Sequence, residues 1–354
     1  MKKMPLIAAT AVAALALTGC SGGGNGASDG PSTELNVYAW AGEIPDTVYA
    51  KFTEETGIKV NVDNFDSNET MIAKLAAGNS GYDLIEPSQY AVQQLVGQDL
   101  LEKIDYEQVE GFENIGPTFL DPSYDPDNAY SVPWVWGTTG LLYNSTCTGG
   151  EEITSWKSLF DDSYKGKTYM LDNMLAAYIA GLQVNGFDAD STDEAEIKKA
   201  TQSLIDQKPM LAGYNSTNYY DLVASGDACI AEAWGGTNSA KVVAENDDVH
   251  YVIPEEGGSM WVDGLSIPKG VKHSDAAYKF INFLLQPEVA AMATNDGGLA
   301  SPNTAALEHI TDKGLTENAA VYPSDEQLKN ADFIVDPGAA MQFYQDGWTR
   351  VKAS

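Results

Sequence analysis

Segments typical of short strands alternate with segments typical of helices along most of this chain. The predicted elements are a strand over residues 34–40, a helix over 45–55 that ends at Gly57, a strand over 58–62, a helix over 69–77, a strand over 83–85 and a helix over 91–97. Neighbouring parallel strands need a long crossover connection, and this connection is usually a helix. The alternation therefore predicts an α/β fold of mainly parallel sheets flanked by helices.

Two longer β-prone runs interrupt this pattern. Residues 130–144 are rich in aromatic side chains and are broken by proline and glycine, and strand and helix segments alternate again from Ser155 onward. A second run covers residues 260–268 and precedes a predicted helix over 275–285, which Pro287 ends. The chain is long enough for two lobes with separate cores, so we interpret the two runs as crossings between lobes.

The N-terminus has the layout of a secretory signal, with two lysines, an apolar stretch over residues 6–17 and small residues before Cys20. An uncleaved membrane-spanning helix is the alternative, but it takes about 20 apolar residues. We therefore predict a cleaved signal peptide over residues 1–19. The sequence Leu17-Thr18-Gly19-Cys20 resembles the bacterial lipobox, which implies that Cys20 is lipidated and anchors the protein on the extracytoplasmic face of the cell membrane.

Residues 20–33 are rich in glycine and polar side chains and predict a flexible tether, because such a segment cannot offset the entropy of ordering it. No later segment has enough uninterrupted apolar length to cross a bilayer, so we expect the remainder to be held at the membrane by lipid alone.

The chain is strongly acidic, with a formal net charge of −31. This charge disfavours nucleic acid as a partner, because nucleic-acid binding needs a basic surface. It is consistent with a cationic ligand and equally with an acidic, solubilising surface. The only arginine is Arg350, so the body of the protein lacks the bidentate group that commonly binds carboxylates and phosphates.

No motif indicates a metal, a cofactor or a catalytic nucleophile. The three histidines are scattered without zinc-like spacing, and no Gly-x-Ser-x-Gly sequence is present. We therefore expect a protein that is not an enzyme. After lipidation of Cys20, Cys147 and Cys229 remain as a pair in an oxidising compartment, where a disulfide between them is possible but not required by the sequence.

Several ordered motifs carry a resemblance to a known family: FTEETGIKV at 52–60, SNETM at 67–71, YDL at 82–84, PSQY at 87–90, WGTTG at 136–140, WVD at 261–263 and INFLL at 281–285. From residue 34 to the C-terminus the chain resembles the polyamine-binding proteins of bacterial ABC importers. The resemblance implies the two-lobed type II periplasmic-binding fold, a monomer that encloses its ligand in the cleft between lobes, and a membrane permease as partner. It places lobe 1 at 34–138 plus 262–308 and lobe 2 at 139–261 plus 309–354.

A small cationic amine needs carboxylates and aromatic faces, because its ammonium group forms ionic hydrogen bonds and cation–π contacts while its stem is apolar. The resemblance implies that six residues supply this chemistry: Trp40, Ser88, Tyr90, Trp234, Trp261 and Asp263. Each has an ordinary structural alternative, since tryptophans usually fill cores and Asp or Ser often stabilise turns.

The sequence also departs from the family at the expected site. The family usually carries a tyrosine three positions after the first tryptophan, where this chain has Glu43. It carries two acidic residues where this chain has Asn173 and Ala176, with only Asp172 nearby. We therefore add Glu43 and Asp172 to the predicted ligand-binding residues.

Two further departures replace an expected aromatic residue by Leu299 and an expected polar residue by Ile334. The changes remove contacts from the far end of a long polyamine and add the Glu43 carboxylate at the near end. An unpartnered second ammonium would be costly to bury. We therefore predict a short diamine such as putrescine in preference to spermidine.

Two alternatives remain open. Tyr219-Tyr220 together with abundant carboxylates is compatible with the same transport role for ferric ion or another small molecule, because hard cations prefer oxygen ligands. A secreted enzyme is the other alternative.

Overall fold

The computed structural model describes residues 31–354. The predicted signal peptide, the lipidation site at Cys20 and most of the predicted tether lie outside the described residues. Within residues 31–354, none of the helices combines the length and the apolar character that crossing a bilayer requires.

The N-terminal sheet is parallel throughout. It consists of β1 (Glu34–Trp40), β2 (Lys59–Phe65) and β3 (Leu84–Ile85) in the order β2-β1-β3. Leu35, Val37 and Ala39 alternate along β1 and are fully buried, because the strand lies between its two neighbours and is covered by helices.

Each helix after these strands has a local reason for its bounds. The helix α1 (Asp46–Thr56) ends at Gly57, which adopts a left-handed conformation with φ of 71°. The helix α2 (Asn68–Ala76) begins after Ser67, whose side chain caps the helix by accepting a backbone hydrogen bond. The helix α3 (Gln89–Gly97) follows β3 through a proline-containing turn.

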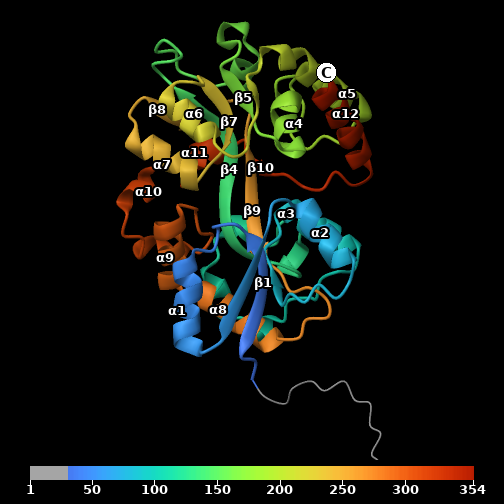
Figure 1. Cartoon of the computed structure of the whole chain (residues 1–354), viewed down its shortest axis with the longest axis vertical. Helices are drawn as coiled ribbons and strands as arrows, with labels where there is room; N and C mark the ends of the chain where they lie inside the picture. Colours follow the sequence, from blue (N-terminus) through green and yellow to red (C-terminus); the bar gives the residue numbers. More distant parts are fainter. Residues whose placement is uncertain (1–30) are drawn as a thin grey trace, which may run out of the picture. The chain divides into compact units, whose positions relative to one another are not determined.

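Two long strands run through the middle of the molecule (Figure 1). All 13 residues of β4 (Val132–Asn144) are buried, and β4 pairs antiparallel with β9 (Ser259–Leu265). The ladder shifts between Pro133 and Val135, where proline has no backbone N–H to donate. These strands correspond to the two runs predicted as crossings.

The second sheet is mixed. Its order is β10-β9-β4-β7-β5-β6, and β8 pairs antiparallel with the distal end of β4. The remaining strands are β5 (Thr168–Met170), β6 (Gly213–Tyr214), β7 (Ile230–Trp234), β8 (Val249–Val252) and β10 (Asp332–Phe333).

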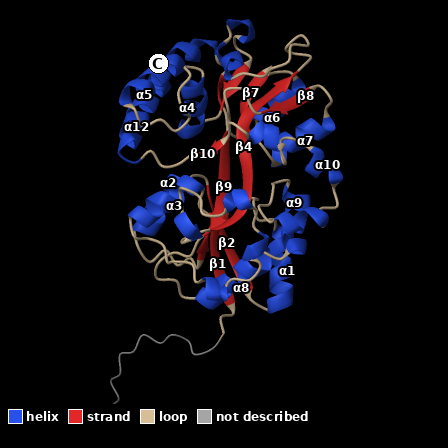
Figure 2. Cartoon of the chain, turned by 180° about the vertical axis from the view of Figure 1, so that it is seen from behind, coloured by secondary structure: helices blue, strands red, loops and turns tan. Residues whose placement is uncertain are grey.

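Helices lie on both sides of the strands (Figure 2). The remaining α-helices are α4 (Met174–Gln183), α5 (Glu194–Gln207), α6 (Tyr219–Ser225), α7 (Thr237–Glu245), α8 (Ser274–Leu284), α9 (Pro287–Gly297), α10 (Lys313–Glu317), α11 (Asp325–Leu328) and α12 (Met341–Ala353). The arrangement confirms the predicted α/β class, and each predicted helix and strand is present with its ends shifted by three residues or fewer.

The sequence patterns missed α9. Pro287 was predicted only to end the preceding helix, but it is also the first residue of α9. Proline suits that position because the first helical residues have no intrahelical partner for their N–H groups.

Aromatic side chains pack α8, a late segment of the chain, against α1, the helix that follows the first strand of the N-terminal sheet. The ring of Phe52 on α1 lies 4.8 Å from that of Phe280 and 5.3 Å from that of Phe283, both on α8. The backbone N–H of Ser32, a residue assigned to the tether, donates to Asp275 at the start of α8 at 3.1 Å.

Cys147 and Cys229 form a disulfide, with their Cα atoms 5.0 Å apart. The bond joins the segment after β4 to the residue before β7, so it closes a long loop within the second sheet.

Candidate functional site

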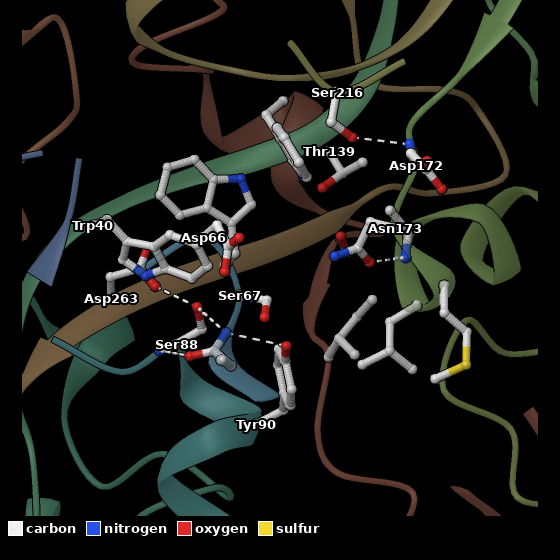
Figure 3. Close-up of a pocket in the computed structure, with 18 of the residues that line it drawn as sticks. Trp40, Asp66, Ser67, Ser88, Tyr90, Thr139, Asp172, Asn173, Ser216 and Asp263 are labelled. Carbon is white, nitrogen blue, oxygen red and sulfur yellow. Dashed lines mark hydrogen bonds between the residues drawn. The ribbon is translucent and has the colours of Figure 1, made fainter. Parts of the chain in front are cut away.

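A cavity of about 790 Å³ lies between the elements of the two sheets, a volume typical of small-molecule sites. All eight predicted ligand-binding residues line it: Trp40, Glu43, Ser88, Tyr90, Asp172, Trp234, Trp261 and Asp263. Figure 3 shows Trp40, Ser88, Tyr90 and Asp263 on one side and Asp172 and Asn173 on the other. The structure therefore brings together residues more than 200 positions apart in the sequence.

Asp263 is held in place by Ser88. The Ser88 hydroxyl donates to Asp263 Oδ1 at 2.5 Å, and the two residues also form an isolated antiparallel bridge. Asp263 is only 4% exposed. Burial raises the pKa of Asp263 to about 6, and the hydrogen bond from Ser88 partly offsets this rise because it stabilises the charged form.

Two more carboxyl groups lie beside Asp263. Burial raises the pKa of Glu43 well above its ordinary value, and the negative charges of Asp263 and Glu86 raise it further. Burial and the charge of Asp263 likewise raise the pKa of Glu86, which accepts a 3.1 Å hydrogen bond from the backbone N–H of Trp40. Within the described residues, Glu43 Oε2 and Glu86 Oε1 are buried without a hydrogen-bond partner.

The cavity lining contains no basic side chain among the described residues, although five carboxylates contribute to it. Unpaired buried carboxylates are costly, and a cation is the species that relieves this cost. The site is therefore electrostatically suited to a cationic ligand and unsuited to an anion.

Aromatic rings flank the carboxyl groups. Trp40 ends β1 and packs on Phe65 with ring centroids 4.4 Å apart. Trp261 lies on β9 across from Gly137 of β4, and a methyl group at position 137 would overlap its six-membered ring. Gly137 thus leaves the space in which Trp261 lies against β4 beside the cavity.

Asn68 organises the side of the site that carries Ser88. Its side-chain amide donates to Ser88 Oγ at 2.9 Å and to the Tyr90 hydroxyl at 3.0 Å. Tyr90 in turn donates to Glu69 at 3.3 Å. Sequence reasoning missed Asn68 as a site residue, although it belongs to the SNETM motif, and missed Glu86, whose only local signal is a carboxylate directly after a buried strand.

Trp234 stands at the end of β7, where its carbonyl oxygen accepts a hydrogen bond from Ser239 at 2.6 Å and one from the Tyr219 hydroxyl at 3.2 Å. The following Gly236 has a positive φ of 83° and closely approaches Leu299. The turn after Trp234 therefore depends on glycine.

The tyrosine pair that suggested ferric ion also lines the cavity. Burial raises the pKa of Tyr219 to about 12, and its hydroxyl already bonds to Trp234. No group of three or more His, Cys, Asp or Glu side chains within residues 31–354 is arranged to hold a metal ion. The Tyr219 hydroxyl is already engaged by hydrogen bonds within the protein.

On the opposite side of the cavity, around the start of α4, the polar side chains are already paired within the protein. Asp172 forms a 2.6 Å ion pair with Lys352 of α12. Asn173 caps α4 by accepting a 3.0 Å hydrogen bond from the backbone N–H of Ala176. The side chain of Asn173 is therefore engaged in holding the helix start.

Apolar side chains complete this side. They are Met174, Leu175, Ile179, Ile334 and Met341, while Leu299, which also lines the cavity, lies against Gly236. The cavity is thus asymmetric, with a carboxylate-rich end at Asp263 and a mainly apolar surface around the start of α4.

Comparison with known proteins agrees with this architecture. Residues 47–324 match the family described as bacterial extracellular solute-binding protein. The spermidine/putrescine-binding periplasmic protein of Escherichia coli is 34% identical over 321 residues, which cover 90% of this chain and 91% of the relative.

Solved structures agree as well. The spermidine/putrescine ABC transporter substrate-binding protein PotD from Streptococcus pneumoniae matches with a TM-score of 0.79 and 32% identity, over 91% of this chain and 99% of that one. The TpPotD lipoprotein of Treponema pallidum matches with a TM-score of 0.81 and 28% identity, over 90% and 99%. These matches confirm the predicted resemblance, and this chain belongs to the family of bacterial extracellular solute-binding proteins, together with the spermidine/putrescine-binding proteins of ABC transporters.

Proposed function

We propose that this protein binds a small cationic amine outside the cytoplasm and delivers it to an ABC importer, with a short diamine such as putrescine preferred over spermidine. One observation carries the proposal: Asp263 and Glu43 line one end of a cavity whose described lining has no basic side chain, and the buried carboxyl group of Glu86 lies beside them. The names of the relatives, which mention spermidine and putrescine, support the same ligand class.

The preference for a short ligand follows from the asymmetry of the cavity. Glu43 and Asp263 lie at the same end, so charge recognition is concentrated there. The other end presents apolar side chains of α4 and an Asp172 carboxylate that is already paired. A distant second ammonium would lose its hydration there without gaining a free partner.

The mechanism we propose is closure of two lobes around the ligand. The predicted lobes meet within two paired strands, since the boundary after residue 138 falls in β4 and the boundary after residue 261 falls in β9. A ligand that contacts both lobes makes more contacts in the closed form than in the open form. It therefore shifts the equilibrium toward the closed form. The closed monomer would then dock on the permease.

The N-terminal signal and Cys20 lead us to propose a lipid anchor on the outer face of the membrane. The name of the Treponema pallidum relative, a lipoprotein, supports this part of the proposal. Mass spectrometry of the membrane-extracted protein should find a diacylated N-terminal cysteine, and Cys20→Ser should release the protein from the membrane.

The ligand class is tested by calorimetry on refolded protein comprising residues 21–354. Putrescine, cadaverine, spermidine, spermine, agmatine and choline are titrated in turn, and we expect the tightest binding for a short diamine. Asp263→Asn should abolish it, while Asp247→Asn, an exposed carboxylate outside the cavity, should not. No binding across the panel would refute the amine class, and tenfold tighter binding of spermidine than putrescine would refute the length preference.

A further inference from the structure

The C-terminal helix α12 brings a lysine of the protein itself to Asp172, a residue of the cavity lining. Lys352 Nζ lies 2.6 Å from Asp172 Oδ1. Asp172 is the one cavity-lining carboxylate that forms a salt bridge within residues 31–354. The remaining carboxylates of the lining stay available to a ligand.

Lys352 is surrounded as a bound amine would be. Its Nζ lies 4.7 Å from the ring centroid of Tyr214 and 5.4 Å from that of Trp348, and these two rings are in edge contact at 5.1 Å. A carboxylate together with two aromatic faces is the combination that binds ammonium groups. The protein therefore fills a cation site next to the lining residue Asp172 with its own side chain, although Lys352, Tyr214 and Trp348 do not themselves line the cavity.

The position of Asp172 is fixed independently of Lys352. Its backbone N–H donates to Ser216 Oγ at 2.9 Å, and Asn173 begins α4 directly after it. Asp172 consequently remains at the cavity lining whether or not the lysine is present. Without Lys352, its carboxylate would be free to receive a cation from the cavity.

We propose that Lys352 is a specificity-determining residue: its ammonium group neutralises Asp172 and so denies a partner to the distal ammonium of a long polyamine. The inference rests on the proposed function, because it presumes that the ligand is an amine bound at Asp263. It assigns the rejection of longer ligands to one ion pair, Asp172–Lys352, in addition to the apolar side chains of α4.

A purely structural ion pair would behave differently. The side chains of Lys352 and Asp172 are 39% and 50% exposed, and such pairs contribute little to stability. Removing the lysine should therefore leave the unfolding transition nearly unchanged. The informative measurement is the ratio of affinities for spermidine and putrescine.

The test replaces Lys352 by methionine, which keeps most of the aliphatic stem and removes the charge. We expect Lys352→Met to raise spermidine affinity by roughly three- to fivefold, the range for one partly exposed charge pair, with putrescine affinity changed by less than about twofold. Lys198→Met is the matched control, because Lys198 also forms an exposed ion pair, but its partner Glu194 does not line the cavity as Asp172 does.

The double variant Asp172→Asn/Lys352→Met tests whether the gain in spermidine affinity depends on the Asp172 carboxylate. The gain for spermidine should disappear in it, because the freed carboxylate is then missing. An unchanged affinity ratio in Lys352→Met, an equal gain in Lys198→Met, or a gain that survives Asp172→Asn would each overturn the inference while short-diamine binding by the wild type stands. If the wild-type protein binds no amine, the proposed function fails and the inference fails with it.

Discussion

The Ser88 hydroxyl donates a 2.5 Å hydrogen bond to the Asp263 carboxylate and thereby joins the start of α3 to strand β9. Ser88 stands at the N-terminal cap position of α3, yet its side chain does not cap the helix. A residue type that usually stabilises a helix start is instead directed toward a buried carboxylate. The hydrogen bond favours the charged form of Asp263 in an environment that otherwise favours the neutral one.

Replacing Ser88 by alanine should raise the pKa of Asp263 further above 6, because the charged form loses its donor. Diamine affinity at pH 7 should fall by roughly tenfold, in line with the ~1.5–3 kcal/mol of a hydrogen bond to a charged group. Calorimetry at pH 7 and pH 9 checks this, and the loss should be smaller at pH 9. Ser225→Ala, outside the cavity, is the control, and an equal loss at both pH values would contradict the explanation.

Asp263 should make the empty protein less stable as the pH rises. Its pKa is about 6 in the folded state and about 3.9 when unfolded, so between these values the folded state binds more protons. The free energy of unfolding contributed by Asp263 therefore falls as pH rises from about 4 through 6, by ~2–3 kcal/mol in total. Ligand binding should strengthen over the same range, because the ionised carboxylate attracts the ammonium group.

The measurement is chemical unfolding of wild type and Asp263→Asn between pH 4 and pH 8 without ligand. Relative to wild type, the variant should gain stability as the pH rises, since asparagine does not titrate. A stability difference that is constant with pH would show that Asp263 keeps an ordinary pKa.

Gly137→Ala should weaken ligand binding by displacing a ring. The added methyl group would overlap Trp261, which lies across from it on β9, so the indole would have to move. We expect at least a tenfold loss of diamine affinity and a shift in tryptophan fluorescence, given that a displaced ring loses its cation contact. Gly97→Ala is the control because nothing lies within 4 Å of its added carbon, and unchanged binding in Gly137→Ala would exclude Trp261 from the ligand site.

The disulfide should contribute to stability and not to recognition. Cys147 and Cys229 are separated by 82 residues, and closing a loop of that size in the unfolded chain stabilises the folded state by about 4.5 kcal/mol in the chain-entropy model. Urea unfolding of Cys147→Ser/Cys229→Ser should show a loss of ~2–5 kcal/mol. Diamine affinity measured well below the transition should stay within twofold of wild type, because neither cysteine lines the cavity.

Much of the local structure, and eight of the residues that line the cavity, could be predicted from the sequence. Strand β1 and helices α1 to α3 follow from periodicity and from residues such as Gly57, whose conformation ends α1. All eight predicted site residues line one cavity, and four of them, Ser88, Tyr90, Trp261 and Asp263, lie in the motifs that carry the family resemblance.

The site contacts that were not predicted depend on residues far apart in the sequence, and no local pattern encodes them. Asn68 reads as an ordinary first residue of a helix, and only folding brings its amide to Ser88 and Tyr90. Asp172 reads as a free acidic residue, but α12 places Lys352 against it from 180 positions away. Long-range pairing of this kind depends on helix packing and not on spacing in the chain.

The pairing of β4 with β9 also limits how the two lobes can move. Both proposed connections between the lobes belong to one ribbon of hydrogen-bonded strands, so one cannot slide past the other without breaking the backbone ladder from Val132–Leu265 to Thr139–Ser259. Paired strands twist and bend more readily than they shift register. The two proposed lobes could therefore rotate about this shared ribbon as the cavity closes, while Asp263 on β9 keeps its register against β4.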